Sequence, residues 1–341
     1  MTTTMQAVPL TEEQRSYYKM ILRPFLSRQR VPRGVKQPTV YDMGLGKELP
    51  QDLKGKISFR LQHSNGIGRG GYAKVFKGTY KPSWRGHKVM VALKFLELPY
   101  GPDVEAKSVQ YLHRETAVWR TLKHPNILAL LGICSGLKYP MSTVPALVSP
   151  YCPLGSLGKF LMNTPLVHRL PLARQIASAV DYIHAQDIVH GDIKPENIMM
   201  DGECRPLLCD FGRSMIIGVS GFETALASSL QYTAPELLNS RTEMVTLTKP
   251  SDIYSLTVTL LRVFTNRTPF HPDDGPYIVR LLGAGQRPTI DTYLDCPEMS
   301  EALWEIFNVG WACDPSHRLD ARTYTTRLDA LPPTSPSIIP E

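Results

Sequence analysis

The sequence of 341 residues has no long apolar run, no cysteines spaced as C-x-x-C and no internal repeat. No stretch approaches the roughly 18 apolar residues of a membrane-spanning helix. The first ten residues also lack the basic and then apolar pattern of a secretion signal. We therefore expect a protein of the cytosol (cytoplasmic) or the nucleus that does not span a membrane.

The six cysteines show none of the spacings that are typical of zinc sites or disulfide scaffolds, and we expect reduced thiols. Lysine and arginine outnumber aspartate and glutamate by 38 to 31, which gives a net charge of +7. Such a balance fits nucleic acid, an anionic membrane or the handling of phosphate. The densest basic stretch, at residues 28–36, is interrupted by proline and contains no aromatic residue. We therefore expect no nucleic-acid partner.

Composition divides the chain into three segments, and its 43% of hydrophobic residues is typical of a packed globular protein. Residues 1–56 form an N-terminal extension in which a capping box predicts one short helix over residues 12–23. That helix could dock on the rest of the protein, pair two copies of the chain or bind a partner. Residues 57–330 are densely patterned, and residues 331–341 form a proline-rich tail that we expect to be flexible.

Within the middle segment, strand-like patterns come first and helical patterns follow. Short β-prone runs cover residues 59–67, 73–80, 88–96, 128–134 and 146–149. One helical run, over residues 105–122, divides these strands, and helical periodicity dominates beyond Gly155, for example over 172–184 and 253–264. This order predicts an α+β fold with two unequal lobes.

Three glycines, Gly68, Gly70 and Gly71, lie between the first two strand-like runs. Glycine lets the backbone approach phosphate oxygens and offer its N–H groups to them. A tight hairpin in any protein could look the same, so this pattern alone leaves both interpretations open.

Lys94 lies in a predicted strand, on the same face as Ala92, where a lysine is usually a solvated charge. The following helical run contains Glu115 on the apolar face that Leu112 and Trp119 define. A carboxylate in that position is costly unless it is paired. We therefore predict an ion pair between Lys94 and Glu115.

The motifs further along the chain resemble the signature of the eukaryotic protein kinase superfamily, in the right order. They are His190–Asn197, Asp210–Gly212 and Ala234–Glu236, which follow the glycines and Val91–Lys94. The resemblance covers residues 57–330. It implies the bilobal protein kinase fold, with a small antiparallel β-sheet N-lobe carrying one helix (about 57–150) and a larger, mainly helical C-lobe (about 151–330). It also implies that Arg318 pairs with Glu236.

The resemblance implies a catalytic role for several residues, because phosphoryl transfer depends on positioning and charge neutralisation. Asp192 would orient the substrate hydroxyl and accept its proton, while Lys194 would neutralise the γ-phosphoryl group. Asn197 and Asp210 would hold Mg²⁺, with Mn²⁺ as the alternative metal. The cofactor implied is ATP, and the partners implied are protein substrates.

A nucleotide site follows from the same resemblance. Its residues would be Gly68, Gly70, Gly71, Ala73, Val75, Ala92, Lys94, Ser149, Tyr151, Cys152 and Met199. Lys94 would bind the α- and β-phosphates and would be steadied by Glu115. Ser149 would be the gatekeeper, a small residue that leaves room for bulky inhibitors. Cys152 and Cys209 would line the pocket and could react with electrophiles, although core packing is the more common role of cysteine.

Lys194, two residues after Asp192, is typical of serine/threonine kinases, so we expect Ser/Thr hydroxyls on proteins as substrates. Other motifs are similar to the tyrosine-kinase-like branch, among them Leu131–Cys134 and Trp311–Pro315. The stretch Arg120–Leu128, together with the His-Gly-Asp motif, resembles the expanded kinase sets of basidiomycete fungi.

Two positions depart from the kinase pattern. Ala73 replaces the third glycine of the loop, and Gly191 replaces the catalytic-loop arginine that normally pairs with an activation-loop phosphate. These departures leave a pseudokinase, which binds nucleotide or partners and signals as a scaffold, as the alternative to an active enzyme. A small-molecule kinase is a third interpretation, which the Ala-Pro-Glu segment disfavours.

The activation segment carries hydroxyl residues. Thr224 and Ser228 are candidates for autophosphorylation, whereas Ser229 aligns with a structural position; all could equally be ordinary polar loop residues. Glu196 could attract a basic residue of a peptide substrate or be a solvated carboxylate.

Overall fold

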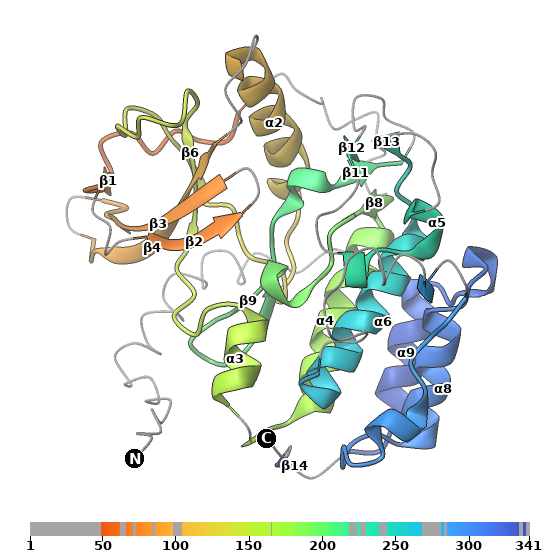
Figure 1. Ribbon diagram of the computed structural model, residues 1–341. Coiled ribbons are helices and arrows are strands. Elements are labelled where there is room, and N and C mark those ends of the chain that lie inside the picture. Colours follow the sequence, from red (N-terminus) through yellow and green to blue (C-terminus); the bar gives the residue numbers. More distant parts are fainter. Residues whose placement is uncertain are drawn as a thin grey trace, which may run out of the picture. The chain divides into compact units, whose positions relative to one another are not determined.

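The computed structural model in Figure 1 describes residues 49–61, 66–70, 73–83, 86–97, 104–164, 166–217, 224–225, 230–238, 244–267, 281–282, 285–333 and 337–338. The chain divides between Pro153 and Leu154 into two compact units. We call the described residues up to Pro153 the small unit and those from Leu154 the large unit. The helix predicted at residues 12–23 lies outside the described residues.

The small unit is an antiparallel sheet with one helix. Its strands pair in the order β1-β3-β4-β6-β5. In addition, β2 pairs with β3. The elements are β1 (Ile57–Ser58), β2 (Gly66–Gly70), β3 (Ala73–Tyr80), β4 (Val89–Leu96), α2 (Val104–Trp119), β5 (Gly132–Cys134) and β6 (Ala146–Pro150). This confirms the predicted strands over 73–80, 88–96 and 146–149 and the helix that divides the strands.

Two strand predictions are wrong in part. Residues 59–61 lie outside any strand, and the run predicted over 128–134 forms a strand only at its last three residues. Phe59 nevertheless packs against the core, with its ring 5.6 Å from the ring of Phe76. An apolar residue in a β-prone run thus indicates that its side chain is buried. It does not show that the backbone pairs in a sheet, because an irregular segment can also bury such a residue.

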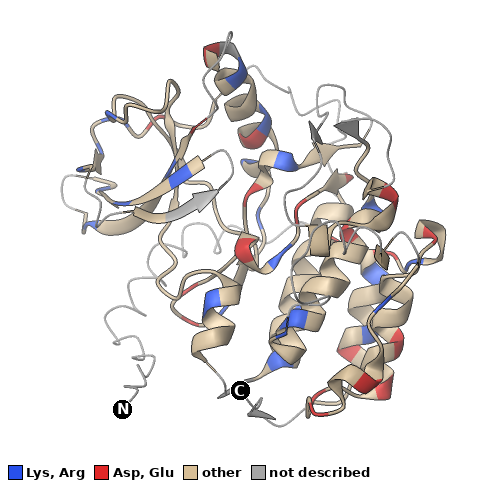
Figure 2. Ribbon diagram, in the orientation of Figure 1, with Lys and Arg blue, Asp and Glu red and all other residues tan. Residues whose placement is uncertain are grey.

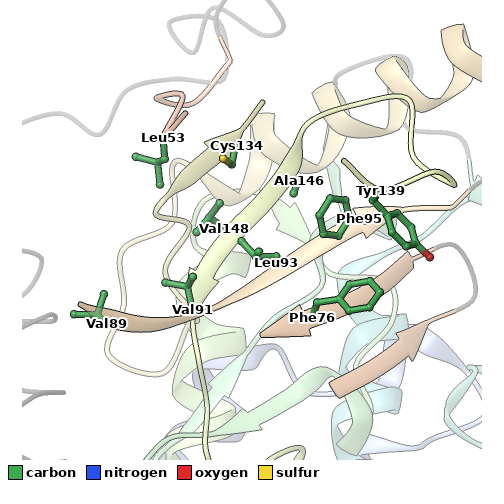
Figure 3. Close-up of a cluster of buried hydrophobic side chains, with 10 residues drawn as sticks. All are labelled: Leu53, Phe76, Val89, Val91, Leu93, Phe95, Cys134, Tyr139, Ala146 and Val148. Atoms are coloured by element: carbon green, nitrogen blue, oxygen red, sulfur yellow. The ribbon is translucent and has the colours of Figure 1, made fainter. Parts of the chain in front are cut away.

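The core of the small unit lies on one face of the sheet (Figure 3). Along β4, Val91, Leu93 and Phe95 are almost fully buried and point into this core, because alternate side chains of a strand lie on one face. The residues between them, Ala92 and Lys94, are half-buried on the opposite face. The sheet therefore separates an apolar core from a face that carries charge.

A residue of the predicted N-terminal extension completes this core. Leu53 is 1% exposed and belongs to the core cluster, and its backbone N–H donates to the carbonyl of Ile133 at 2.8 Å. Gly132 makes the approach possible: its φ is +155°, and a Cβ there would lie 2.4 Å from the Gln51 carbonyl oxygen. The chain just before residue 57 is thus packed against the sheet.

The large unit is mainly helical. Its helices are α3 (Leu157–Asn163), α4 (Arg169–His184), α5 (Pro235–Leu238), α6 (Lys249–Thr265), α8 (Glu301–Gly310) and α9 (Ala321–Ala330). Helix α6 contacts both α4 and α8, and α9 packs on α4 and α8 (Figure 1). Thirteen of the 17 residues of α6 are buried, which makes this helix the centre of the unit. The helices predicted over 172–184 and 253–264 are confirmed by α4 and α6.

Short strands and 3₁₀ turns connect these helices. The strand pairs are β7 (Leu166–Val167) with β14 (Ser337–Ile338), β8 (Ile188–Val189) with β11 (Met215–Ile216), β9 (Ile198–Met200) with β10 (Pro206–Leu208) and β12 (Thr224–Ala225) with β13 (Met244–Val245). The 3₁₀ turns are Pro195–Asn197, Phe211–Arg213, Leu230–Tyr232, Ile290–Tyr293 and Pro315–His317. Two residues of the tail that we expected to be flexible thus pair with β7.

The α+β prediction is confirmed, with a small antiparallel sheet carrying one helix and a larger helical unit. Charged residues of both signs are distributed over the two units (Figure 2). In the part of the chain that the structure describes, no helix is long and apolar enough to span a membrane.

Candidate active site

The ion pair predicted between Lys94 and Glu115 is confirmed. The Lys94 Nζ lies 2.7 Å from Glu115 Oε1, and the carboxylate side chain is only 3% exposed. Strand β4 supplies the lysine and helix α2 supplies the glutamate. Because a buried charge without its partner is strongly unfavourable, each residue fixes the position of the other.

Strand register places the predicted nucleotide residues of the small unit on the face of Lys94. Val75 on β3 lies opposite Lys94, and Ala92 on β4 lies opposite Ser149 on β6. Directly paired residues of antiparallel strands project from the same face. Val75, Ala92, Lys94 and Ser149 therefore share the face that is turned away from the core.

The glycine-containing hairpin joins β2 to β3. Gly68 pairs with Val75 and Gly70 pairs with Ala73, while Gly71 lies outside the described residues. Ala73 is 6% exposed and is not among the residues with positive φ. The methyl group that replaces the expected glycine is therefore accommodated without backbone strain.

The chain that leaves β6 carries the predicted hinge. Cys152 is buried and Tyr151 is half-buried, and the Tyr151 N–H donates to the Met90 carbonyl at 3.4 Å. The Lys77 Nζ lies 4.7 Å from the centroid of the Tyr151 ring. This contact was not predicted, because it joins residues that are 74 positions apart in sequence and depends on the strand register (151 − 77 = 74).

In the large unit, three predicted residues of the loop after β8 form one hydrogen-bonded group. The Lys194 ammonium lies 3.0 and 2.8 Å from the two carboxylate oxygens of Asp192. The Asn197 Nδ2 donates to the backbone carbonyl of Asp192 at 2.8 Å and to its Oδ2 at 2.7 Å. The structure thus brings Asp192, Lys194 and Asn197 together, and both neighbours hold the same carboxylate.

The predicted metal ligands are suited to a hard cation. The two donated hydrogen bonds use the amide nitrogen of Asn197, which leaves its Oδ1 as the oxygen for a metal. Asp210 follows Cys209, whose N–H donates to the Asn197 carbonyl at 2.9 Å. Amide and carboxylate oxygens are ligands that Mg²⁺ accepts. Asp210 also has a left-handed backbone, with φ 65° and ψ 72°, which aspartate tolerates better than most residues.

Asp252 on α6 anchors this loop, a role that our sequence analysis missed. Its carboxylate accepts the backbone N–H groups of His190 at 2.7 Å and Gly191 at 2.8 Å. The ring of His184 lies 2.9 Å from the same carboxylate. Asp252 is 1% exposed near the start of α6, whose later residues are largely apolar, so the reasoning that we applied to Glu115 could have identified it.

His190 links the loop to the segment before Asp210. Its Nδ1 accepts the Asp192 N–H at 3.2 Å, so its Nε2 carries the proton and donates to the Cys209 carbonyl at 3.1 Å. The side chain is fully buried, and burial lowers its pKa despite the nearby carboxylates of Asp252, Asp192 and Asp210. A neutral imidazole is the form that can make both hydrogen bonds.

Gly191, the second departure, is explained by local packing. Its φ is +76°, and a Cβ in its place would lie 2.3 Å from Leu247 Cδ1 and 3.3 Å from the Arg213 carbonyl oxygen. Leu247 belongs to a small apolar cluster with Val189, Met215 and Leu237. The Leu247 side chain thus occupies the space that the Cβ of any residue other than glycine would need at position 191.

The remaining predictions concern Met199, the pairing of Arg318 with Glu236 and the hydroxyl residues of the activation segment. Met199 is half-buried in β9 and forms an isolated bridge with Ser156. The pairing of Arg318 with Glu236 is confirmed by two hydrogen bonds, at 2.7 and 2.8 Å. Ser228 and Ser229 and the side chain of Thr224 lie outside the described residues.

Comparison with known proteins identifies the family. The family model for the protein kinase domain matches residues 61–327. The chain is 30% identical over 258 residues (74% of this chain and 18% of the relative) to the "Probable serine/threonine-protein kinase drkD" of Dictyostelium discoideum. It is 35% identical over 227 residues (64% and 31%) to the L-type lectin-domain containing receptor kinase I.7 of Arabidopsis thaliana.

A third relative, the dual specificity protein kinase shkC of Dictyostelium discoideum, is 26% identical over 305 residues, which is 84% of this chain and 55% of that protein. The chain thus spans between about a fifth and just over a half of the lengths of these three relatives. The matched family region covers well over half of the 341 residues. The chain belongs to the protein kinase family.

Proposed function

We propose that this protein transfers the γ-phosphoryl group of Mg-ATP to Ser/Thr hydroxyls of proteins, its own chain included. Membership of the kinase family implies the use of ATP and of a divalent metal in general. The observation that carries the proposal is the group formed by Asp192, Lys194 and Asn197, with every separation between 2.7 and 3.0 Å. These residues supply a base, a cation and a metal ligand next to one another.

The chemistry in the large unit follows from this group. Asp192 accepts the proton of the substrate hydroxyl as the new O–P bond forms and the bond between the γ-phosphorus and the bridging oxygen breaks, which releases ADP. Lys194 stabilises the negative charge on the γ-phosphoryl oxygens. Asn197 and Asp210 would hold Mg²⁺, which supplies further charge neutralisation when it is bound.

The small unit serves to bind and orient the nucleotide. Lys94, fixed by Glu115, presents an ammonium group to the α- and β-phosphates. Val75 and Ala92 offer a small apolar surface for the adenine on the same face. The buried Ser149 leaves space behind that surface because its side chain is small.

Lys194 supports the preference for Ser/Thr. The names of two relatives, a serine/threonine-protein kinase and a dual specificity protein kinase, are both compatible with transfer to these hydroxyls. A phosphoamino-acid analysis that finds label on tyrosine alone would reject this part of the proposal.

Gly191 supports low dependence on activation-loop phosphorylation, because the arginine that would bind such a phosphate is absent and Leu247 occupies its place. Treatment with a phosphatase should therefore leave most of the activity. Loss of nearly all activity, with recovery after the loop is phosphorylated again, would contradict this expectation.

The proposal is tested by transfer of labelled γ-phosphate from Mg-ATP to a generic protein substrate and to the protein itself. We expect label on serine and threonine in the wild type and a loss of at least about 100-fold in the Asp192→Asn variant. The alternative, a pseudokinase, is motivated by Ala73 and Gly191. It predicts no transfer by the wild type, although Mg-ATP could still raise its melting temperature.

A further inference from the structure

A cation–aromatic contact joins β3 to the residue that follows β6. The Lys77 ammonium lies 4.7 Å from the centroid of the Tyr151 ring. At this separation the negative face of the ring attracts the cation. Both residues are half-buried, so water screens the contact less than it would on an open surface. Lys77 has no part in the transfer chemistry proposed above.

The position of Lys77 in the sheet places it on the nucleotide face. Lys77 lies opposite Ala92, and Ala92 lies opposite Ser149. Residues paired in this way project to the same side of an antiparallel sheet. Lys77 therefore lies beside Ala92, the residue that we expect against the adenine, and is separated from the level of Lys94 by two residues along the strands.

The two lysines of this face have different partners. Lys94 forms its ion pair with Glu115 at 2.7 Å, which leaves its charge available to a phosphate. The Lys77 ammonium instead lies over an aromatic ring. The partners of the two lysines thus differ in chemistry. The Glu115 carboxylate orients Lys94, whereas Lys77 covers the Tyr151 ring.

Tyr151 is connected to two strands by different parts of the residue. Its backbone N–H donates to the Met90 carbonyl on β4, while its ring is covered by Lys77 from β3. Pro150, the residue before it, is still paired with Val91 on β4. The Lys77 contact involves the side chain of Tyr151, whereas the hydrogen bond to Met90 involves only its backbone.

We propose that Lys77 is a positioning residue of the nucleotide site: by covering the Tyr151 ring, it keeps the chain after β6 in the shape that receives the base of ATP. This inference rests on the function proposed above. Its effect falls on nucleotide affinity and not on the rate of transfer at saturating ATP, because Lys77 does not contact the reacting atoms.

The test measures the Kd of Mg-ATP and of adenosine by calorimetry, together with KM and kcat. Lys77→Met should raise the Kd of both ligands and the KM for ATP by about threefold to tenfold, with kcat unchanged. Lys77→Arg should restore the affinity because it keeps the cation, and Tyr151→Phe should retain it because the ring remains. Tyr151→Leu should match Lys77→Met, and the double variant should be no weaker than either single variant.

A matched control is available on the same strand. The Lys74 Nζ lies 5.5 Å from the ring of Phe76, so it makes a contact of the same kind. Lys74 is paired with Phe95 and hence projects from the core face of the sheet. Lys74→Met removes the same charge and the same type of contact, and it should leave both Kd values unchanged.

Several results would overturn the inference. One is wild-type affinity for both ligands in Lys77→Met. Another is a loss of affinity for Mg-ATP but not for adenosine, which would indicate a direct contact of Lys77 with phosphate. An equal loss in Lys74→Met would indicate a general effect of charge. Melting temperatures without nucleotide verify that each variant is folded. Failure of the wild type itself to bind Mg-ATP would instead reject the proposed function.

Discussion

In the small unit Lys94 is paired with the Glu115 side chain, whereas in the large unit the loop of Asp192 is anchored to α6 through its backbone N–H groups. The Lys94–Glu115 pair joins one side chain from β4 to one from α2. The Asp192 loop is instead bound by Asp252, which accepts two consecutive backbone N–H groups. The position of the Lys94 ammonium therefore depends on a side-chain ion pair, and the position of the Asp192 carboxylate depends on the shape of its loop.

This difference matters for function because binding a phosphate and accepting a proton require different precision in the position of the side chain. A cation that has lost its orienting partner still attracts phosphate but no longer holds it in one position. A base must lie within hydrogen-bond reach of the proton that it accepts, so its backbone must be fixed. Asp192 satisfies this demand through the hydrogen bonds that its own loop makes to α6 and to His190.

The largest effect is expected from removal of the loop anchor. Asp252→Ala removes the acceptor of three donors, which are the buried N–H of His190, the part-buried N–H of Gly191 and the buried His184 ring. The free energy of unfolding should fall by about 3–5 kcal/mol, and transfer activity should become undetectable. Urea denaturation and a transfer assay measure the two effects.

The matched control for that variant is Asp295→Ala, which removes an exposed carboxylate paired with Arg267. We expect stability and activity close to those of the wild type. Equal losses in the two variants would contradict the special role of the backbone anchor.

A smaller effect is expected in the small unit. Glu115→Gln keeps the shape of the side chain but removes the charge that orients Lys94. Transfer should fall by about 100-fold because phosphate positioning is lost, while the melting temperature changes less than in Asp252→Ala. Glu105→Gln, an exposed residue of the same helix, provides the comparison and should behave as the wild type. An active Glu115→Gln variant would show that Lys94 needs no partner.

The shared face of the small unit gives a third prediction. Ser149 is paired with Ala92 and is 6% exposed, so a larger side chain would fill the space next to the adenine surface. Ser149→Met should weaken the binding of a bulky inhibitor by roughly tenfold to 100-fold and affect ATP much less. A competition assay measures this. Unchanged affinity for such a compound would mean that Ser149 is not the gatekeeper.

The smallest effect concerns pH and the His190 ring of the large unit. Because burial lowers the pKa of His190 in the folded protein, the unfolded chain binds more protons in the window just below the ordinary histidine pKa of about 6.5. The stability that the neutral ring contributes is therefore present above that pH and declines as the pH falls below it. Urea denaturation at pH 7.5 and 5.5 should show a smaller loss of stability in His190→Gln than in the wild type.

The exposed His87 serves as a control, since His87→Gln should keep the wild-type dependence on pH. If the His190→Gln variant lost as much stability between the two pH values as the wild type does, the buried ring would not be the group responsible.

Much of the small unit could be predicted from its sequence. Alternating apolar and polar residues indicate its strands, and a carboxylate on an apolar helix face indicates an ion pair. Lys94 and Glu115 were paired in this way, and the structure confirms the contact. The same reasoning would have identified Asp252, a carboxylate within helix α6, but two of its three partners are backbone N–H groups, which have no signal in the sequence.

Other features depend on geometry that side-chain patterns do not encode. The contact of Lys77 with Tyr151 depends on the register of β3 and β4. The packing of Leu53 against the sheet depends on the left-handed backbone of Gly132, which a glycine in the sequence permits but does not require. The strand expected over residues 128–134 was overestimated, since Leu128 is buried outside any strand and Leu131 makes only one hydrogen bond to Val148 of β6.

We propose that the small unit binds the nucleotide and that the Asp192 loop performs the transfer. The most direct measurement determines Mg-ATP affinity and the rate of γ-phosphoryl transfer on the same samples of wild type and Asp192→Asn. We predict Kd values within about threefold of each other and a transfer rate at least about 100-fold lower in the variant. Equal transfer rates in the two proteins, or no transfer by a wild type that binds Mg-ATP, would contradict the account.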